Sequence, residues 1–283
     1  MYERVVIATD LSATTAPLLG AIPDLRRLGT REVTLVSVLE PGVFGGKDSA
    51  RRADYERQLE QMAKNLREQD LTVKTEVVEG FSVQQILSVA GHNLASLVVV
   101  GSRGYSIVRE VFLGSTLSSL LQATQLPVLV KHLDADRAGD DSGEEGRLLN
   151  SVVLATDLTV AAREAEQAAV DLAPRAGRML LLSVLEQQGE DVAEENELRE
   201  RLEALAERCR AAGATVETQL ASGHPASDVV REVAHERDAS LVIIGKHGYS
   251  GYRNNVMGGT SAKVALYSER HVLMVPTPMP SQF

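Results

Sequence analysis

The chain carries the stretch SLVVVGSRGYS at residues 96–106 and the related stretch SLVIIGKHGYS at residues 240–250. In each stretch, four consecutive aliphatic residues lead directly into a glycine. Short apolar runs without polar interruption are typical of strands buried on both faces, as the strands of parallel sheets are. The glycine that follows lets the backbone turn tightly where such a strand ends. The two stretches therefore predict a parallel sheet, and they predict it twice.

Three further segments are also written twice, in the same order along the chain. VVIATDLS at Val5 returns as VVLATDLT at Val152, LVSVLE at Leu35 as LLSVLE at Leu181, and VVEGFSVQQIL at Val77 as LASGHPASDVV at Leu220. The nearly constant offset indicates duplication of a unit of about 140 residues. We predict one domain at residues 1–133 and a second at 148–283, joined by a polar, acidic linker at 134–147.

Within each half, apolar runs alternate with segments of helical spacing. The strands predicted in the first half are Val5–Ala8, Val33–Val38, Leu71–Val78, Leu97–Val100 and Val128–Val130, and the helices are Ser12–Leu28, Arg51–Gln69, Val83–Leu94 and Ser115–Gln122. The strands predicted in the second half are Val152–Ala155, Met179–Val184, Thr215–Leu220, Leu241–Ile244 and Val272–Val275. This alternation predicts an α/β fold, with a doubly wound parallel sheet and helices on both faces in each half. Ser12 and Thr159 are placed to cap the first helix of their halves.

The composition restricts the classes of function. A net charge of −10 without a basic stripe argues against binding to nucleic acid or anionic membranes. A single cysteine, Cys209, excludes an intrachain disulfide, and the histidines lack metal-ligand spacing, so we predict no metal site. No apolar run is long enough to span a membrane and the N-terminal stretch does not resemble a signal peptide, so we expect a cytoplasmic protein.

Glycines mark the most informative candidate site. Ligands of doubly wound sheets bind beyond the carboxyl ends of the strands. The first strand is followed by TDLS or TDLT without glycine, which argues against a dinucleotide site for NAD or FAD. After the fourth strand, the spacing G-x2-G-x9-G occurs in both halves, and the first copy continues with Ser115. Free N–H groups at the next helix start would form an anion cradle there. The alternative is that these glycines only end a strand and begin a helix.

The G-x2-G-x9-G spacing, the D-x-S or D-x-T after the first strand and the SVLE-like second strand together resemble the universal stress protein family, over the whole chain as two tandem domains. The resemblance implies a five-stranded parallel sheet of strand order 3-2-1-4-5 in each domain. It also implies ATP or AMP as ligand, with Mg²⁺ as an optional companion ion. The two halves are expected to form an intrachain pseudo-dimer through their fifth strands, and a homodimer of chains is a further option.

The resemblance assigns roles to residues of the first half. Thr9 and Asp10 match adenosine contacts, and the main chain of Val38 matches the adenine contact. The family's loop under the ribose and phosphates corresponds to Gly101, Ser102, Arg103 and Gly104. The family's triphosphate-binding helix start corresponds to Gly114, Ser115 and Thr116. Asp10 has a second interpretation, as a helix-capping acid beside Ser12, and the two roles are compatible.

The second half has equivalents of these residues but departs from the family pattern once. The equivalents are Thr156, Asp157, Val184, Gly245, Lys246, His247, Gly248, Gly258 and Thr260. Gly259 replaces the hydroxyl residue, which would cost about tenfold to a hundredfold in affinity for a phosphate. A cation at Lys246 would offset that loss. His247 takes the place of Arg103, either as a ligand contact or as a solvent-facing loop residue.

These observations favour a nucleotide-dependent regulator of a stress response over an enzyme. The S-G-G-x-D-S loop of ATP pyrophosphatases, the H-I-G-H signature of adenylate-forming transferases and the G-x-S-x-G elbow of hydrolases are absent. Two alternatives stay open. One is slow ATP hydrolysis or autophosphorylation involving Asp10 or a nearby serine. The other is an interaction module that binds no nucleotide. The sequence identifies no protein partner.

Overall fold

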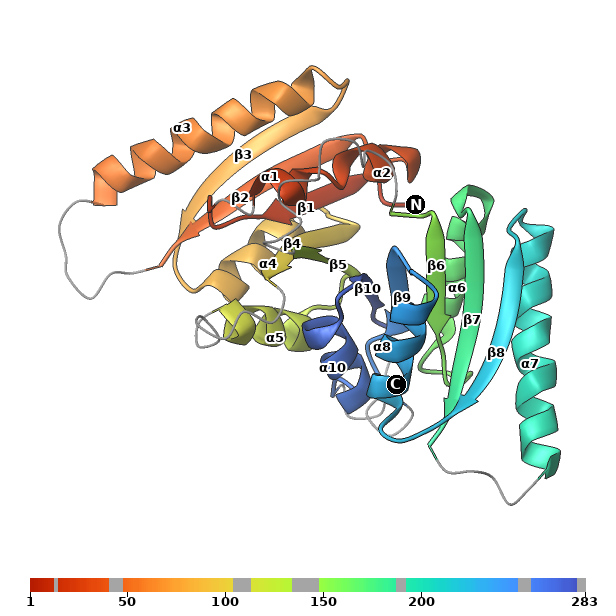
Figure 1. The fold of residues 1–283 in the computed structure, drawn as a ribbon. Coiled ribbons are helices and arrows are strands. Elements are labelled where there is room, and N and C mark those ends of the chain that lie inside the picture. The colour runs from red at the N-terminus through yellow and green to blue at the C-terminus, as the bar shows by residue number, and fades with distance from the viewer. Residues whose placement is uncertain are drawn as a thin grey trace, which may run out of the picture. The chain divides into compact units, whose positions relative to one another are not determined.

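The computed structural model describes residues 1–12, 15–40, 48–103, 113–133, 148–186, 192–248 and 256–278. The chain divides into two compact units, Met1–Glu145 and Gly146–Phe283. Strands and helices alternate along each unit (Figure 1). The predicted linker lies outside the described residues.

The first unit contains a parallel sheet of order β3-β2-β1-β4-β5. This is the predicted order 3-2-1-4-5. Its elements are β1 (Arg4–Ala8), α1 (Thr15–Leu19), α2 (Ile22–Arg27), β2 (Glu32–Leu39), α3 (Asp48–Arg67), β3 (Thr72–Glu79), α4 (Ser82–His92), β4 (Leu97–Arg103), α5 (Leu113–Ala123) and β5 (Val128–Leu133).

The second unit repeats the arrangement, with β8-β7-β6-β9-β10 all parallel. Its elements are β6 (Ser151–Ala155), α6 (Arg163–Leu172), a 3₁₀ turn η1 (Ala173–Arg175), β7 (Arg178–Leu185), α7 (Val192–Ala211), β8 (Val216–Ser222), α8 (Ala226–Glu236), β9 (Leu241–Gly245), α10 (Gly259–Tyr267) and β10 (His271–Val275). The α/β class and the duplication are therefore confirmed.

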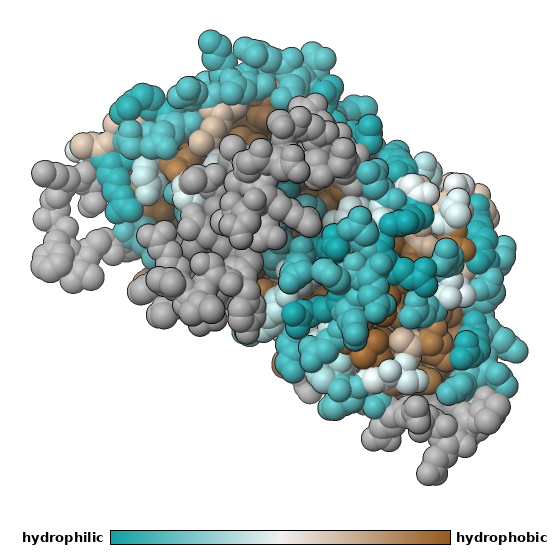
Figure 2. Space-filling model, viewed as in Figure 1, coloured by the Kyte–Doolittle hydropathy of each residue, from teal (hydrophilic) through white to brown (hydrophobic). Residues whose placement is uncertain are grey.

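Each sheet is buried at its centre, which explains why its strands are apolar without alternation. All five residues of β6 and all five of β9 are buried. In the second unit α6 packs against α7 and α8 against α10, so that both faces of the sheet are covered (Figure 1). On the face seen in Figure 2, hydrophilic residues cover most of the described surface and hydrophobic residues show in patches between them. Among the described residues, no helix has both the length and the apolar character needed to cross a membrane.

Two local predictions about the first helices are wrong. The segment Ser12–Leu28 is not one helix, because α1 ends at Leu19 and α2 begins at Ile22 with Pro23 in its first turn. Proline lacks the N–H that a continuing helix needs, but a first turn accommodates it. Thr159 does not cap α6, whose N-cap is Ala162. The predicted capping role of Ser12 is not tested, because residues 13–14, which follow it, lie outside the described residues.

Candidate functional site

The loop after the first strand is built in the same way in both units. The N–H of Leu11 donates to Thr9 Oγ1 at 3.0 Å, and the N–H of Leu158 donates to Thr156 Oγ1 at 2.9 Å. Both leucines lie in the left-handed region, with φ of 60° and 56°. That conformation costs a leucine about 1 kcal/mol or more, and such strain is concentrated at functional sites. The duplicated strain therefore marks this loop as a candidate site.

The two aspartates of this loop organise its backbone. Asp10 Oδ1 accepts the Ser12 N–H at 3.0 Å. Asp157 Oδ1 accepts both the N–H of Thr159 at 3.0 Å and its hydroxyl at 2.7 Å. Both are Asx-type turns, in which the carboxylate replaces a backbone acceptor. Both aspartates are also exposed, so a turn-stabilising role and contact with a ligand are compatible.

In the second unit, the glycine spacing closes a loop between the end of β9 and the start of α10. The N–H of Lys246 donates to the Val275 carbonyl at 2.9 Å, and the Lys246 carbonyl accepts the N–H of Gly258 at 3.0 Å. A Cβ added to Gly258 would lie 3.1 Å from the backbone nitrogen of Gly248. Two glycines separated by nine intervening residues thus bring their backbones together, and a side chain at Gly258 would push them apart.

Helix α10 begins at this contact without a side-chain cap. The Ser261 hydroxyl does not cap the helix, since it donates to the Gly245 carbonyl at 2.6 Å and ties the helix start to the strand end. A Cβ added to Gly259 would meet nothing within 4 Å. The first N–H groups of a helix, together with its positive dipole end, favour an anion. This helix start therefore has the chemistry of a phosphate cradle with room at Gly259.

Lys246 and His247 are buried, with 0% and 3% of their surfaces exposed. The interpretation of His247 as a solvent-facing loop residue is therefore wrong. Burial lowers the pKa of the Lys246 amine from its ordinary value of 10.5, because the charged form loses its hydration. The local sequence did not predict this burial. Lys246 is held by a residue twelve positions further along the chain, since its carbonyl accepts the N–H of Gly258.

Replacing Lys246 by methionine should remove the contribution of this buried amine to the pH dependence of stability. Between the lowered pKa of the folded protein and 10.5, the unfolded chain holds more protons at this amine. The free energy of unfolding should therefore rise with pH through that window in the native protein, and less so in Lys246→Met. Urea denaturation of both proteins near neutral pH and at about pH 10 measures the two changes with pH. An equal rise in the native protein and in Lys246→Met would show that this amine does not titrate in the window.

Contacts from other elements hold the two loops, and no sequence motif indicated these contacts. The Ala161 carbonyl would lie 3.4 Å from a Cβ on Gly245, so the loops after β6 and β9 lie against each other. The same carbonyl accepts the hydroxyl of Thr277 at 2.6 Å. Three segments distant in sequence therefore converge at the carboxyl ends of β6, β9 and β10.

Two charged side chains fix the loop after β6 from the helices. Glu166 on α6 accepts the Thr156 hydroxyl at 2.7 Å, and Arg201 on α7 donates to the Leu158 carbonyl. Beside them is a hollow of about 390 Å³, lined by Leu158, Thr159, Val160, Arg163, Glu166 and Arg201. Neither Glu166 nor Arg201 belongs to a recognisable motif, so sequence reasoning missed both.

In the first unit, the prediction of a loop at Gly101–Arg103 is wrong. These residues continue β4, where Gly101 pairs with Lys131 and Arg103 with Leu133. Pairing with β5 supplies partners for their backbone groups, which outweighs the weak strand propensity of glycine. Gly104 lies outside the described residues.

The remaining candidates occupy the ends of strands and the start of a helix. Val38 is in β2 opposite Val78, and Val184 is in β7 opposite Ala221. Helix α5 begins at Leu113, so that its first turn contains Gly114, Ser115 and Thr116. Thr260 is half-buried in the first turn of α10.

Comparisons with known proteins agree with this architecture. A model of the universal stress protein family matches residues 1–132 and 149–276. A universal stress protein of Mycolicibacterium smegmatis is 34% identical over an alignment of 217 positions, which covers 72% of this chain and 69% of that protein.

A solved structure shows the same fold. The crystal structure of a universal stress protein from Archaeoglobus fulgidus covers 96% of both chains, with a TM-score of 0.76 and 20% identity. A universal stress protein in complex with cAMP covers 46% of this chain and 98% of its own, with 26% identity and a TM-score of 0.37.

Proposed function

The chain belongs to the universal stress protein family, and on this premise we propose that it binds an adenine nucleotide, ATP or AMP, and acts as a nucleotide-dependent regulator in a stress response. We place the stronger site in the first unit. Mg²⁺ would accompany the phosphates of ATP there.

The observation that carries this proposal is the closed glycine loop at the uncapped start of α10. The close approach of Gly258 to the Gly248 backbone leaves helix N–H groups where the strand ends. Such a site favours a phosphate through hydrogen bonds and the helix dipole together. The strained, aspartate-containing loop after β6 contacts the same strand end through Ala161 and Gly245, which supports a nucleoside site beside the phosphate site.

The two units differ in the residue that follows the last glycine. Ser115 offers a hydroxyl in the first turn of α5, whereas Gly259 offers none in α10. A hydrogen bond to a charged phosphate contributes about 1.5–3 kcal/mol. The second unit should therefore bind the nucleotide about tenfold to a hundredfold more weakly, unless Lys246 offsets the loss.

Counting bound nucleotide tests the proposal. Freshly purified protein is denatured, and the released adenine nucleotides are identified and counted per chain by chromatography. The stripped protein is then titrated with ATP, AMP and cAMP. We expect about one nucleotide per chain, since only one unit keeps the hydroxyl. Absence of bound nucleotide together with absence of binding in the titration would contradict the proposal.

A gain-of-function variant extends this test to the second unit. Gly259→Ser supplies the hydroxyl at a position where a new Cβ meets nothing within 4 Å. We expect nucleotide affinity at the second site to rise about tenfold, and the count per chain to move toward two. Gly259→Ala is the matched control, because it adds the Cβ without the hydroxyl. Equal affinities for the serine and alanine variants would show that the hydroxyl does not reach the phosphate.

A further inference from the structure

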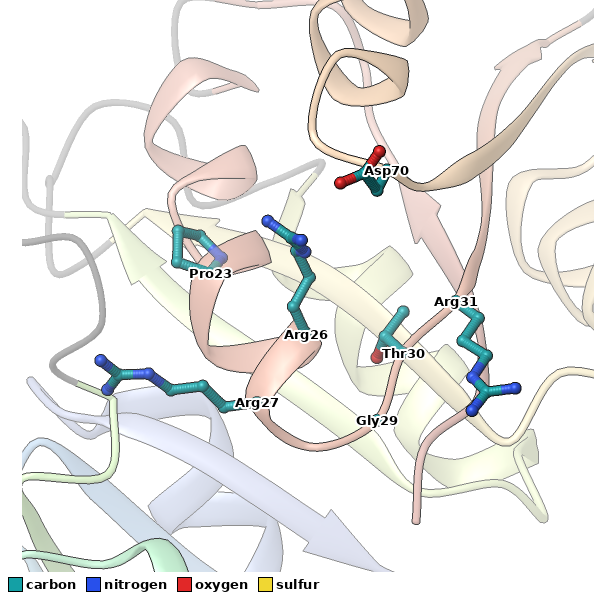
Figure 3. A pocket seen from close by; sticks show the side chains of 7 residues that line it. All are labelled: Pro23, Arg26, Arg27, Gly29, Thr30, Arg31 and Asp70. Carbon is teal, nitrogen blue, oxygen red and sulfur yellow. The ribbon is translucent and has the colours of Figure 1, made fainter.

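Three arginines line a hollow in the first unit, away from the glycine sites. The hollow has a volume of about 600 Å³ and is lined by Pro23, Arg26, Arg27, Gly29, Thr30, Arg31 and Asp70 (Figure 3). It is a shallow hollow at the surface, since Arg26, Arg27, Arg31 and Asp70 are all exposed. Arg31 immediately precedes β2 and Asp70 lies just before β3. The hollow is therefore at the amino ends of strands, whereas the candidate nucleotide sites follow their carboxyl ends.

The turn that carries the arginines is fixed by its own backbone. Gly29, at a φ of +94°, donates its N–H to the Arg26 carbonyl at 2.9 Å, and the Thr30 N–H donates to the Leu25 carbonyl at 3.0 Å. These two bonds form a Schellman motif, which satisfies the last carbonyls of α2. The carbonyls of Leu25 and Arg26 therefore have backbone hydrogen-bond partners, and the arginine side chains are not needed to satisfy them.

Neighbouring segments also anchor Arg31. Its N–H donates to the Glu3 carbonyl at 2.9 Å, and its carbonyl accepts the Thr72 N–H at 2.9 Å. The Thr30 hydroxyl donates to the Tyr2 carbonyl at 2.7 Å. The exposed side chain of Arg31 therefore extends from a backbone held on both sides, which is the rigid support that a binding site needs.

These arginines differ from those on the long helices. Arg52, Arg67 and Arg210 each form ion pairs with carboxylates, at or close to their own helix. Within the described part of the chain, Arg26 and Arg31 form no ion pair. Among the described residues, no carboxylate lies within ion-pair distance of these two guanidinium groups, which leaves them able to pair with an anion.

The arginine hollow is not part of the duplicated fold. At the offset that relates LVSVLE to LLSVLE, Leu172, Ala173 and Gly177 stand where the first unit has Arg26, Arg27 and Arg31. The second unit forms the same sheet without them. The three arginines are therefore not needed to build the fold.

We propose that the arginine hollow binds a chain of linked phosphates, as in an inorganic polyphosphate or the tail of a nucleoside triphosphate. Guanidinium groups pair with phosphate oxygens in a bidentate geometry. Figure 3 shows the three side chains extending in different directions, with Arg26 toward Asp70 and Arg27 and Arg31 away from each other, so one small anion would not contact all three guanidinium groups and an extended anion suits them better. Asp70, the one carboxylate of the lining, opposes such a ligand and limits its affinity.

Inorganic triphosphate, titrated calorimetrically, is the probe for this site. The double variant Arg26→Gln/Arg31→Gln should bind it about 10- to 100-fold more weakly than the native protein. The matched control, Arg57→Gln/Arg199→Gln, removes the same charge from side chains of α3 and α7 that are 72% and 58% exposed. The control should lose less than about threefold, because distant surface charges are screened by salt. Equal losses in the two double variants would overturn the proposal.

Asp70→Asn gives a prediction in the opposite direction. Asp70 has a φ of 59°, which asparagine tolerates, so that the backbone is kept. Removal of its charge should strengthen triphosphate binding about threefold. Unchanged or weaker binding would contradict the assignment, whether or not the arginine variants fold well.

Two further arms identify the source of the phosphates and separate this site from the glycine sites. Triphosphate binding should persist in Gly114→Glu, and its loss there would place the ligand at the glycine loop instead. ATP competing equally well with triphosphate in Gly114→Glu would assign the hollow to a nucleoside triphosphate, and failure to compete would assign it to inorganic polyphosphate. Polyglutamate binding as tightly as triphosphate would overturn the phosphate assignment in favour of an acidic peptide.

Discussion

Gly258→Val should remove nucleotide binding from the second unit, with a loss of about 100-fold or more. A Cβ at this position would lie 3.1 Å from the backbone nitrogen of Gly248 and 3.4 Å from Ser261 Oγ. Because the first of these neighbours is backbone, it cannot rotate away as a side chain would. The valine methyl groups would add to the clash, and would separate the glycine loop from the start of α10. We also expect the free energy of unfolding to fall by about 1–3 kcal/mol.

The measurement needs to distinguish the two units. Backbone amide signals of Gly248 and Thr260, followed by NMR during ATP titration, report on the second site alone. Gly259→Ala is the control, since its new Cβ meets nothing within 4 Å. It should leave the affinity within about twofold, because it changes neither charge nor hydrogen bonding. Native-like binding by Gly258→Val would mean that the two glycine backbones do not form the site.

Leu154→Ala should lower the free energy of unfolding of the second unit by about 3–5 kcal/mol. Leu154 is 0% exposed and lies in β6, opposite Leu181 of β7 and Ile243 of β9. Truncation removes the buried methyl groups and leaves a cavity that the central strand of a sheet cannot close by moving. Urea denaturation, followed by circular dichroism, measures the change in the transition midpoint.

Two variants serve as references for this stability measurement. Ile7→Ala removes the equivalent buried side chain from β1 of the first unit and should cost a similar amount. Val160→Ala truncates a side chain that is 40% exposed and should change the free energy by less than about 0.5 kcal/mol. A comparable loss for Val160→Ala would show that truncation at a surface loop matters as much as truncation in the sheet.

The sequence determined the parts of the fold that depend on local pattern. Uninterrupted apolar runs such as Val5–Ala8 and Leu241–Ile244 fell within β1 and β9, because strands covered on both faces need apolar residues at every position. The duplication and the crossover rules then gave a doubly wound parallel sheet in each unit, and the resemblance to the family gave its strand order. Helix ends were predicted less well. The first helix is broken between Leu19 and Ile22, and the N-cap of α6 is Ala162; the apolar spacing did not reveal either.

The candidate site also has features that the sequence predicted and features that only the structure revealed. Its glycine spacing and its two T-D-L loops could be found in the sequence, because each is a contiguous motif with a backbone reason for its residues. The burial of Lys246 and His247, the contacts from Glu166, Arg201 and Thr277, and the arginine hollow could not. Each of these depends on residues far apart in the chain. Only the tertiary structure brings such residues together, because the packing of helices against the sheet, and no local spacing, sets their distances.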